Sequence, residues 1–340
     1  MVVACVTVLL LYGPVSADYS ARKDVRAYVD ELVSAHGFGR EALLETFASA
    51  RHQPRIVEAM SRLAERTKKW VEYRKIFFRD ERIAGGVDFW ADNSTALESA
   101  EASFKVAPEY VVAIIGVETY FGRIMGSHRV LDALSTLAFD YPPRSGFFRN
   151  ELTEFLLLAR EEKRSPADLK GSYAGAMGYG QFIPSSYRHY AVDFDGDGIR
   201  DIWTNTTDAI GSVANYFARH GWRGDGEVVL RVTASGGEAE KVANTGLALN
   251  RTVTELRDLG VEVPDIDGDA QAALFRMELE DGVEYWLALH DFYVITRYNR
   301  SAMYALAVHQ LSQAIKAGRE ASLARSAPPP GAGKPAVGGR

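Results

Sequence analysis

Cysteine is almost absent from this sequence, in which Cys5 is the only one among 340 residues. A single cysteine excludes an intrachain disulfide and a cysteine metal cluster. The seven histidines lack metal-ligand spacing such as HExxH, and no long run of lysine and arginine suggests nucleic-acid binding. Because the formal net charge is −6, an anionic substrate would have to be attracted locally, within a cleft.

Long apolar runs are also missing, except near the start. Residues Val2–Tyr12 form a run that suits the core of a signal peptide and is too short to span a bilayer, which needs about 20 residues. Val15-Ser16-Ala17 fits the small-x-small cleavage pattern, although no basic residue precedes the run. We therefore predict a signal peptide over 1–17 and export to the periplasm. A buried helix, or a lipoprotein attached to the outer membrane through Cys5, is the alternative.

The remaining chain has a mainly helical pattern with one β-rich section. Apolar residues recur at three- and four-residue spacing from Val25 onward, whereas Asp80–Asp92, with Gly85-Gly86, is interpreted as a connection. Period-two alternation predicts strands between 225 and 290. We expect an α+β protein, mainly α. Its predicted parts are a helical domain over 18–224, a small β-rich subdomain over 225–290, a helical return over 291–325, and a disordered Pro/Gly tail over 326–340.

Glu118 ends an apolar stretch that begins at Pro108, a residue suited to the first position of a helix. It lies seven residues after Val111 and four after Ile114, so a helix puts its carboxyl on their face. Burial raises the pKa of a carboxyl, and an acid that stays protonated near neutral pH can protonate the leaving oxygen in glycosidic-bond cleavage. Helical geometry alone leaves open that Glu118 lies past the buried part and pairs with Arg123.

A glycine-rich and aromatic segment follows at residues 172–186 (SYAGAMGYGQFIPSS). Glycines let backbone amides approach a ligand, and aromatic rings stack on the faces of sugars. Serine and glutamine side chains bind hydroxyl and acetamido groups. The composition therefore favours a sugar-binding segment, with a tightly packed turn region as the alternative.

The first half of an EF-hand calcium loop is matched by the next segment, with acidic residues at positions 1, 3 and 5, glycine at 6 and a backbone carbonyl at 7. These residues are Asp193, Asp195, Asp197, Gly198 and Ile199. Position 12 is Thr204 instead of glutamate, and Asp208 is the next acidic residue that an extended loop could bring back as a ligand. Because aspartates so close together repel one another without a cation, we predict a structural calcium ion within 193–208. No organic cofactor is expected.

Three segments together resemble lytic murein transglycosylases of the B type, the membrane-bound lytic transglycosylase B family. They are 115–122 (IGVETYFG), 171–186 (GSYAGAMGYGQFIPSS) and 192–198 (VDFDGDG). The likeness continues through 208–217 and 292–301 and covers roughly residues 20–318. The resemblance implies a lysozyme-like helical core with a small β domain, and a deep groove for a glycan strand.

The resemblance also implies that Glu118 is the single catalytic carboxyl, and that a set of polar and aromatic residues contacts the substrate. That set is Tyr73, Arg144, Ser172, Gln181, Tyr216, Tyr298, Asn299 and Tyr304. The sequence departs from the family pattern in three places. The basic pair after the Tyr-Pro motif is reduced to Pro143-Arg144, which weakens the expected peptide recognition there. Phe147 replaces an expected tyrosine, and the acidic loop is one residue longer before Asp208.

The predicted reaction cleaves the β-1,4 bond between N-acetylmuramic acid and N-acetylglucosamine and leaves 1,6-anhydromuramyl ends. Glu118 acts first as acid and then as base, so no second carboxylate is required. The alternatives are a lysozyme-type hydrolase and a wall-binding scaffold with an inactive site. We expect a monomer that binds peptidoglycan glycan strands and no nucleic acid, and we leave open partners among the cell-wall synthesis proteins.

Overall fold

The computed structural model describes residues 18–63 and 68–326, so the predicted signal peptide and the tail from residue 327 lie outside the described residues. Tertiary contacts divide the described chain into two compact units. The first unit contains 18–63, 126–176 and 183–185, and the second contains 68–125, 177–182 and 186–326. The domain boundaries predicted from the sequence stay predictions, because the two compact units are defined by tertiary contacts and their boundaries lie at other residues.

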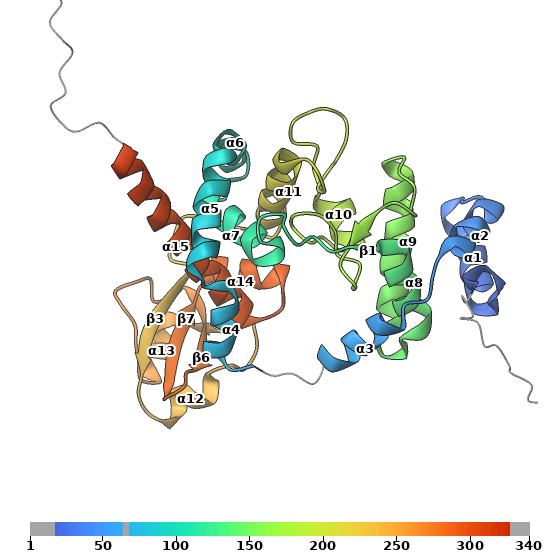
Figure 1. The fold of residues 1–340 in the computed structure, drawn as a ribbon. Coiled ribbons are helices and arrows are strands. Elements are labelled where there is room, and N and C mark those ends of the chain that lie inside the picture. Colours follow the sequence, from blue (N-terminus) through green and yellow to red (C-terminus); the bar gives the residue numbers. More distant parts are fainter. Residues whose placement is uncertain (1–17, 64–67, 327–340) are drawn as a thin grey trace, which may run out of the picture. The chain divides into compact units, whose positions relative to one another are not determined.

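The first unit is helical apart from one short strand pair (Figure 1). The two-residue strands β1 and β2 pair antiparallel, with His128 opposite Gly171. Its elements are η1 (Tyr19–Ala21), α1 (Lys23–His36), α2 (Arg40–Ser49), α3 (Pro54–Leu63), β1 (His128–Arg129), α8 (Val130–Asp140), η2 (Pro142–Arg144), α9 (Ser145–Glu161) and β2 (Lys170–Gly171).

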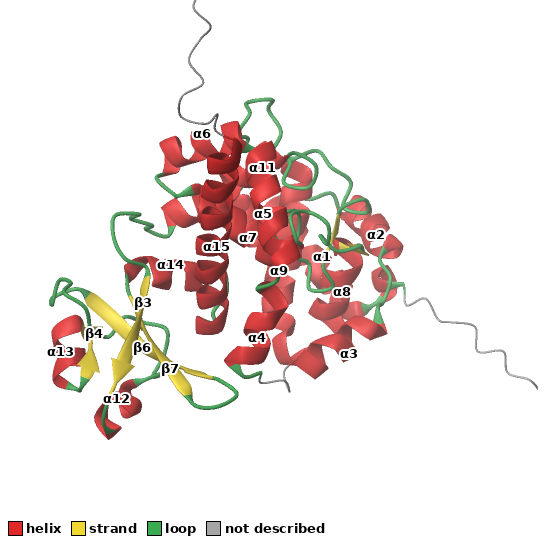
Figure 2. Ribbon diagram, turned by 60° about the vertical axis from the view of Figure 1, so that its left-hand side comes forward, coloured by secondary structure: helices red, strands yellow, loops and turns green. Residues whose placement is uncertain are grey.

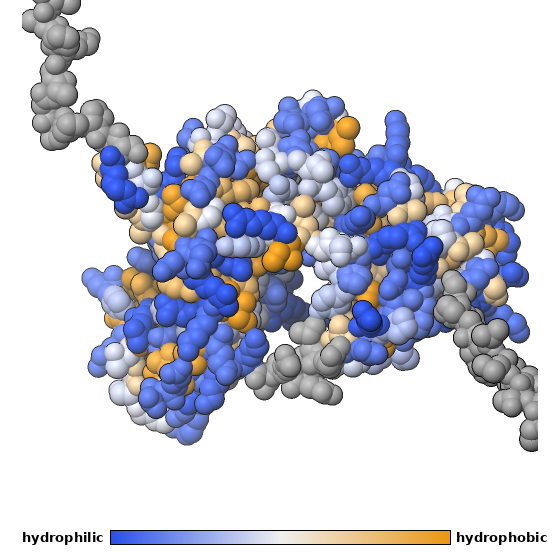
Figure 3. Space-filling model, viewed as in Figure 1, coloured by the Kyte–Doolittle hydropathy of each residue, from blue (hydrophilic) through white to orange (hydrophobic). Residues whose placement is uncertain are grey.

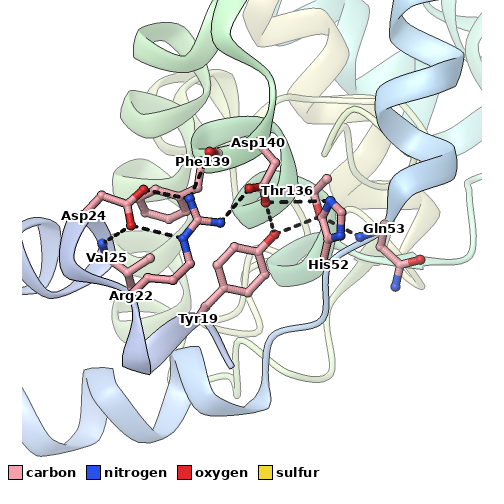
Figure 4. Close-up of polar contacts among 9 residues, drawn as sticks. All are labelled: Tyr19, Arg22, Asp24, Val25, His52, Gln53, Thr136, Phe139 and Asp140. Atoms are coloured by element: carbon pink, nitrogen blue, oxygen red, sulfur yellow. Dashed lines mark hydrogen bonds and ion pairs between the residues drawn. The ribbon is translucent and has the colours of Figure 1, made fainter. Parts of the chain in front are cut away.

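A polar network anchors the first described residues to α8 (Figure 4). Tyr19 is fully buried, and its hydroxyl donates a hydrogen bond of 2.6 Å to Asp140. Arg22 donates to the other oxygen of Asp140, also at 2.6 Å, and the backbone amide of Gln53 donates to Thr136 at 3.0 Å. A buried tyrosine needs such a partner for its hydroxyl. The network therefore fixes the segment that directly follows the predicted signal peptide.

The second unit surrounds a buried central helix, α7 (Pro108–Thr119), which contacts α5, α6, α11 and α15. Every residue from Pro108 to Val117 is buried, so the helix is enclosed on all sides. The sequence predicted a buried stripe along one face of this helix, whereas all of its faces are buried. Its other helices are α4 (Trp70–Phe77), α5 (Asp80–Asp92), α6 (Ser94–Phe104), α11 (Thr206–Arg219), α12 (Gly237–Val242), α13 (Val253–Asp258), α14 (His290–Tyr298) and α15 (Ala302–Ser326). A further helix, α10 (Pro184–Tyr190), begins in the first unit and continues in the second.

The strands of the second unit form one antiparallel sheet in the order β4-β6-β7-β3-β5, yellow in Figure 2. They are β3 (Val229–Ala234), β4 (Arg251–Thr252), β5 (Val261–Glu262), β6 (Gln271–Glu278) and β7 (Val283–Ala288). One face packs through Leu274 and Leu287 onto α12 and α13, while Phe275 contacts Phe292 of α14. The sheet thus packs against helices of its own unit. A mainly helical α+β fold with a small antiparallel sheet is confirmed.

The interpretation of Asp80–Asp92 as a connection is wrong, because these residues form α5. A side chain at Gly86 would lie 2.5 Å from Ile315 of α15, and one at Gly85 would lie 3.2 Å from the ring of Phe121. The glycine pair therefore lets α15 and Phe121 approach the helix closely. Glycine usually weakens a helix by about 1 kcal/mol, but the close packing offsets that cost here.

The surface of the described residues is mixed in hydropathy. Hydrophilic side chains cover most of the face shown in Figure 3, and the apolar areas between them are small. None of the described helices has both the length and the apolar character needed to cross a membrane.

Candidate active site

Glu118 is the one residue of α7 that is not buried, and its side chain is partly exposed. The hydroxyl of Tyr304, itself 2 % exposed, donates a hydrogen bond of 2.6 Å to Glu118 Oε1. Burial raises the pKa of Glu118 to about 7, and the bond from Tyr304 lowers it in part. The carboxyl can therefore hold or release a proton near neutral pH.

Tyrosines from three helices surround this carboxyl. They are Tyr73 of α4, Tyr298 of α14 and Tyr304 of α15. Burial, and after it the charge of Glu118, raises the pKa of Tyr73 to about 12 and raises the pKa of the other two well above the ordinary value. All three hydroxyls are therefore neutral when Glu118 titrates. Among the described residues, no second carboxyl contributes to the pKa of Glu118.

The chain directly after Glu118 turns through three consecutive left-handed residues. Tyr120, Phe121 and Gly122 have φ of 52°, 60° and 82°. Such conformations cost energy for residues other than glycine, so the surroundings must hold them. Thr119 does so, because its hydroxyl donates to the Tyr179 carbonyl at 2.9 Å and accepts from the Gly122 amide at 3.0 Å. The end of the acid-bearing helix is therefore rigidly attached.

Arg82 is a residue at this turn that the sequence interpretation missed. Its Nη1 donates to the Gly116 carbonyl at 2.5 Å, which satisfies a carbonyl near the end of α7. The guanidinium also lies 4.8 Å from the ring centre of Tyr120 and 5.5 Å from that of Phe77. A helical interpretation of 80–92 would have placed Arg82 on a helix near α7, but the Gly85-Gly86 pair led us to interpret this segment as a connection.

Gln181 lies in a tight loop of the second unit, at a left-handed φ of 49°. Its amide nitrogen donates to the carbonyls of Gly178 at 2.9 Å and Met125 at 3.1 Å. A side chain at Gly178 would lie 2.4 Å from the Ile202 carbonyl, so only glycine fits there. Both amide hydrogens are used in the fold, which leaves the side-chain carbonyl oxygen as the group that can accept from a sugar.

Tyr216 and Tyr298 lie against each other, with ring centres 4.7 Å apart. The Tyr216 hydroxyl donates to the Arg297 carbonyl and the Tyr298 hydroxyl to the Gly180 carbonyl, both at 2.6 Å. Tyr216 is 7 % exposed, so its recorded contacts support the loop and its neighbour. Asn299, by contrast, is exposed directly after α14. Direct sugar contacts by these residues stay predictions.

Ser172 and Arg144 belong to the first unit. The hydroxyl of Ser172 accepts from the Ala176 amide at 3.0 Å, within the glycine-rich turn. The guanidinium of Arg144 lies 4.5 Å from the ring centre of Phe147, which is 39 % exposed. Their predicted role in substrate binding is a matter for experiment.

Three aspartates of the acidic loop gather their carboxylates. Ligand oxygens of Asp193, Asp195 and Asp197 all lie within 4.8 Å of one another. Backbone amides of the loop orient them, for example that of Gly198, which donates to Asp193 at 2.7 Å. A cluster of hard oxygen donors at this spacing fits a calcium ion.

Asp208 has a different environment from the three clustered aspartates. It is fully buried, and its two oxygens accept from the amides of Phe194 at 2.7 Å and Asp201 at 2.8 Å. Burial raises its pKa, and backbone amides that include these two oppose that rise. Asp208 therefore acts as a brace, since its hydrogen bonds hold the acidic loop against the first turn of α11. As a metal ligand, Asp208 stays a prediction.

The chain matches the family model described as "Transglycosylase SLT domain" over residues 20–313. It is 43% identical over 313 residues to the membrane-bound lytic murein transglycosylase B of Escherichia coli (strain K12), covering 89% of this chain and 85% of that protein.

Solved structures of similar proteins agree with this match. The catenated lytic transglycosylase SltB1 from Pseudomonas aeruginosa is 50% identical, with a TM-score of 0.86, over 89% of this chain and 100% of that one. The Escherichia coli lytic transglycosylase Slt35 in complex with calcium is 42% identical, with a TM-score of 0.82, over 89% and 96%. SltB3 from Pseudomonas aeruginosa in complex with NAG-anhNAM-pentapeptide is 31% identical, with a TM-score of 0.75, over 86% and 79%.

Proposed function

Since the chain belongs to the membrane-bound lytic murein transglycosylase B family and is a lytic transglycosylase of peptidoglycan, we propose that Glu118 is its single catalytic acid and base. The observation that carries this proposal is the pairing of burial with the Tyr304 hydrogen bond. Burial keeps the carboxyl protonated near pH 7, and the tyrosine fixes its orientation.

The proposed reaction begins when Glu118 gives its proton to the bridging oxygen of the β-1,4 bond between N-acetylmuramic acid and N-acetylglucosamine. The bond between that oxygen and the anomeric carbon of muramic acid breaks. The C6 hydroxyl of the same muramic acid then attacks the anomeric carbon, with help from the acetamido group of the substrate. The Glu118 carboxylate takes the hydroxyl proton, so the acid is restored, a 1,6-anhydro ring forms and no water is consumed.

Within residues 18–63 and 68–326, no second carboxyl shifts the pKa of Glu118, which supports this route over hydrolysis. Ordinary glycosidases use a second carboxylate as nucleophile or as base for water. Here the neighbours of Glu118 are neutral tyrosines. The attacking hydroxyl comes from the substrate itself, so one group that is first acid and then base is sufficient.

The mass of the products tests the reaction. Digestion of purified sacculi should release muropeptides that are lighter by one water than those of a lysozyme-type hydrolase. Glu118→Gln should lower the rate by about a thousandfold or more, because an amide cannot donate this proton. Products at the full hydrated mass, or an active Glu118→Gln protein, would contradict the proposal.

We further propose that calcium binds the carboxylates of Asp193, Asp195 and Asp197. The backbone carbonyl of Ile199, at position 7 of the EF-hand pattern, would be another ligand. The calcium complex of a relative supports this assignment. The ion would neutralise repulsion within the loop and keep it folded, without contacting the substrate. Calcium at a hundred times its dissociation constant should stabilise the protein by about 2.7 kcal/mol. Chelation should therefore lower the Tm of the native protein and leave that of Asp193→Asn unchanged.

Finally, we propose that the protein is exported to the periplasm and that cleavage follows Ala17. Peptidoglycan lies outside the inner membrane, and the run over 2–12 suits a signal peptide. Mass spectrometry of the mature N-terminus tests this proposal directly. A chain that begins at Asp18 would support it, whereas a lipid-modified Cys5 would support the lipoprotein alternative.

A further inference from the structure

Arg82 of α5 is a partly buried cation with unused hydrogen-bonding capacity. Within the described part of the chain, its Nε is buried without a hydrogen-bond partner, and no carboxylate is among the groups that shift its pKa. Burial lowers that pKa, yet an arginine stays charged in proteins. A buried donor that is not used destabilises a fold, and such costs are typical of functional sites. Arg82 is therefore a candidate for a role in the site.

The first contact of Arg82 is with the helix that carries the acid. Its Nη1 donates to the Gly116 carbonyl at 2.5 Å, and the Tyr120 amide donates to the same oxygen at 3.2 Å. The carboxyl end of a helix is partly negative, so a cation placed there stabilises it. Glu118 follows Gly116 within this last turn of α7. Arg82 therefore fixes the turn from which the Glu118 carboxyl projects.

Arg82 also contacts two aromatic rings. Its guanidinium lies 4.8 Å from the ring centre of Tyr120, in the left-handed turn, and 5.5 Å from that of Phe77, the last residue of α4. The ring centre of Phe77 in turn lies 5.2 Å from that of Tyr73. Burial, and after it the charge of Glu118, raises the pKa of Tyr73 to about 12, so Tyr73 is a neighbour of the acid. One side chain of α5 thus supports both the helix that carries Glu118 and the tyrosine beside it.

We propose that Arg82 is a positioning residue for the catalytic acid. The inference rests on the proposed function, in which Glu118 transfers the proton. By holding Gly116 and the Tyr120 turn to α5, Arg82 keeps the Glu118 carboxyl in the orientation in which it accepts the bond from Tyr304. Proton transfer requires this orientation, so loss of Arg82 should slow the chemical step without weakening the affinity for the glycan strand. Arg82 acts through the acid and needs no contact with the substrate.

Kinetics on a soluble glycan strand test this role. Arg82→Met keeps a long apolar side chain against the two rings but has no donor for the Gly116 carbonyl. We expect its kcat to fall about tenfold and its KM to stay within about twofold of the native value. Arg82→Lys keeps a charged donor and should restore kcat to within about threefold of the native value.

A second variant covers the case in which Arg82→Met does not fold. Arg82→Gln, whose shorter side chain also loses the bond to Gly116, then takes its place with the same expected result. An unchanged kcat in the folded methionine or glutamine variant would overturn the proposal.

Arg22→Met is the matched control, because it removes an arginine from a polar network of the first unit. Loss of the bonds to Asp24 and Asp140 should lower the Tm and leave kcat unchanged at a temperature at which the protein is folded. An equal fall of kcat in Arg22→Met and Arg82→Met would show a general effect of stability, and the positioning role would be wrong.

A double variant tests whether Arg82 acts through the bond between Tyr304 and Glu118. Tyr304→Phe alone should lower kcat about fivefold. If both residues orient the same carboxyl, Arg82→Met/Tyr304→Phe should lose about tenfold, close to the larger single loss. A loss of about fiftyfold, the product of the two single losses, would mean independent effects and would contradict the proposal.

Binding measurements separate this proposal from the catalytic one. In a Glu118→Gln background, Arg82→Met should leave the affinity for glycan strands within about twofold of that of Glu118→Gln alone. Weaker binding would show that Arg82 contacts the substrate, which would overturn the positioning role. If Glu118→Gln still forms anhydro ends, the catalytic assignment itself fails. An inactive Glu118→Gln together with an unchanged kcat in Arg82→Met refutes the positioning role alone.

Discussion

Glu118 and the clustered Asp193, Asp195 and Asp197 are carboxyls of the same unit with different surroundings. Glu118 is half-buried, and a single tyrosine hydroxyl binds it. The clustered aspartates lie at the surface and accept several backbone amides, three of them on Asp193 alone. Burial with few donors favours the protonated form of Glu118 and raises its pKa. The amides hold the clustered carboxylates close together, with oxygens directed into one small volume. The comparison explains why one functional group is proposed as a proton donor in one place and as a cation ligand in another.

After removal of the acid by Glu118→Gln, the largest expected effect comes from shifting the position of the carboxyl. Glu118→Asp shortens the side chain by one methylene and takes the carboxyl away from Tyr304 and from the bridging oxygen. We expect the rate of anhydro product formation to fall about a hundredfold, or about 3 kcal/mol, because proton transfer depends on position. Glu98→Asp, on the exposed side of α6, is the matched control and should leave the rate unchanged.

The next effect concerns the brace of the acidic loop. Asp208→Asn replaces one acceptor oxygen by an amide group that faces a buried backbone N–H. We expect a loss of about 2 kcal/mol in the free energy of unfolding, measured in urea with a calcium chelator present. Asp197→Asn, at an exposed member of the cluster, should cost much less under the same conditions. Equal losses in both variants would contradict the division between brace and cluster.

A smaller effect links the acid to stability. The pKa of Glu118 is about 7 in the folded protein, against 4.5 for an ordinary glutamate carboxyl in water. The unfolded chain therefore releases this proton first as pH rises, so the native protein loses stability between pH 4.5 and 7. Glu118→Gln has no such proton.

The Glu118→Gln variant should therefore be as stable as the native protein below pH 4.5. Above pH 7 it should be more stable than the native protein. The gain should be about 1.5 kcal/mol, because the partial exposure of the side chain reduces the full effect of the pKa shift. Thermal unfolding across this range measures the gain. A constant difference at all pH values would show that burial does not set the pKa.

The smallest effect tests the hydrogen bond to the acid. Tyr304→Phe removes the one contact that lowers the pKa of Glu118, so this pKa should rise. Activity requires the protonated form and falls as pH increases, so the alkaline limb of the pH–rate profile should move to higher pH. Below that limb the rate should fall about fivefold, because the carboxyl loses its orientation. Tyr28→Phe serves as the control and should leave the profile unchanged, since its hydroxyl shares a hydrogen bond of 2.7 Å with Thr153 in the first unit.

Much of the fold and part of the site were predictable from local patterns. Pro108 marked the start of α7, and period-two alternation located the strands of the sheet. The aspartate spacing identified the cluster at Asp193, because ligands within one loop are close in sequence as well as in space. The misinterpretation of Asp80–Asp92 has a physical reason. Glycine usually interrupts a helix, and only the close approach of Ile315 explains why it is required there.

By itself, the sequence determined that an acidic residue ends an apolar helix, that a calcium-type loop follows, and which family the motifs resemble. Each of these features depends on residues that are near one another along the chain. The tertiary structure decided what local spacing cannot contain: the bond from Tyr304 to Glu118 spans 186 residues, and Arg82 reaches Gly116 from another helix. The pKa of a carboxyl depends on everything packed around it, so the pKa of Glu118 is raised to about 7 only in the folded protein.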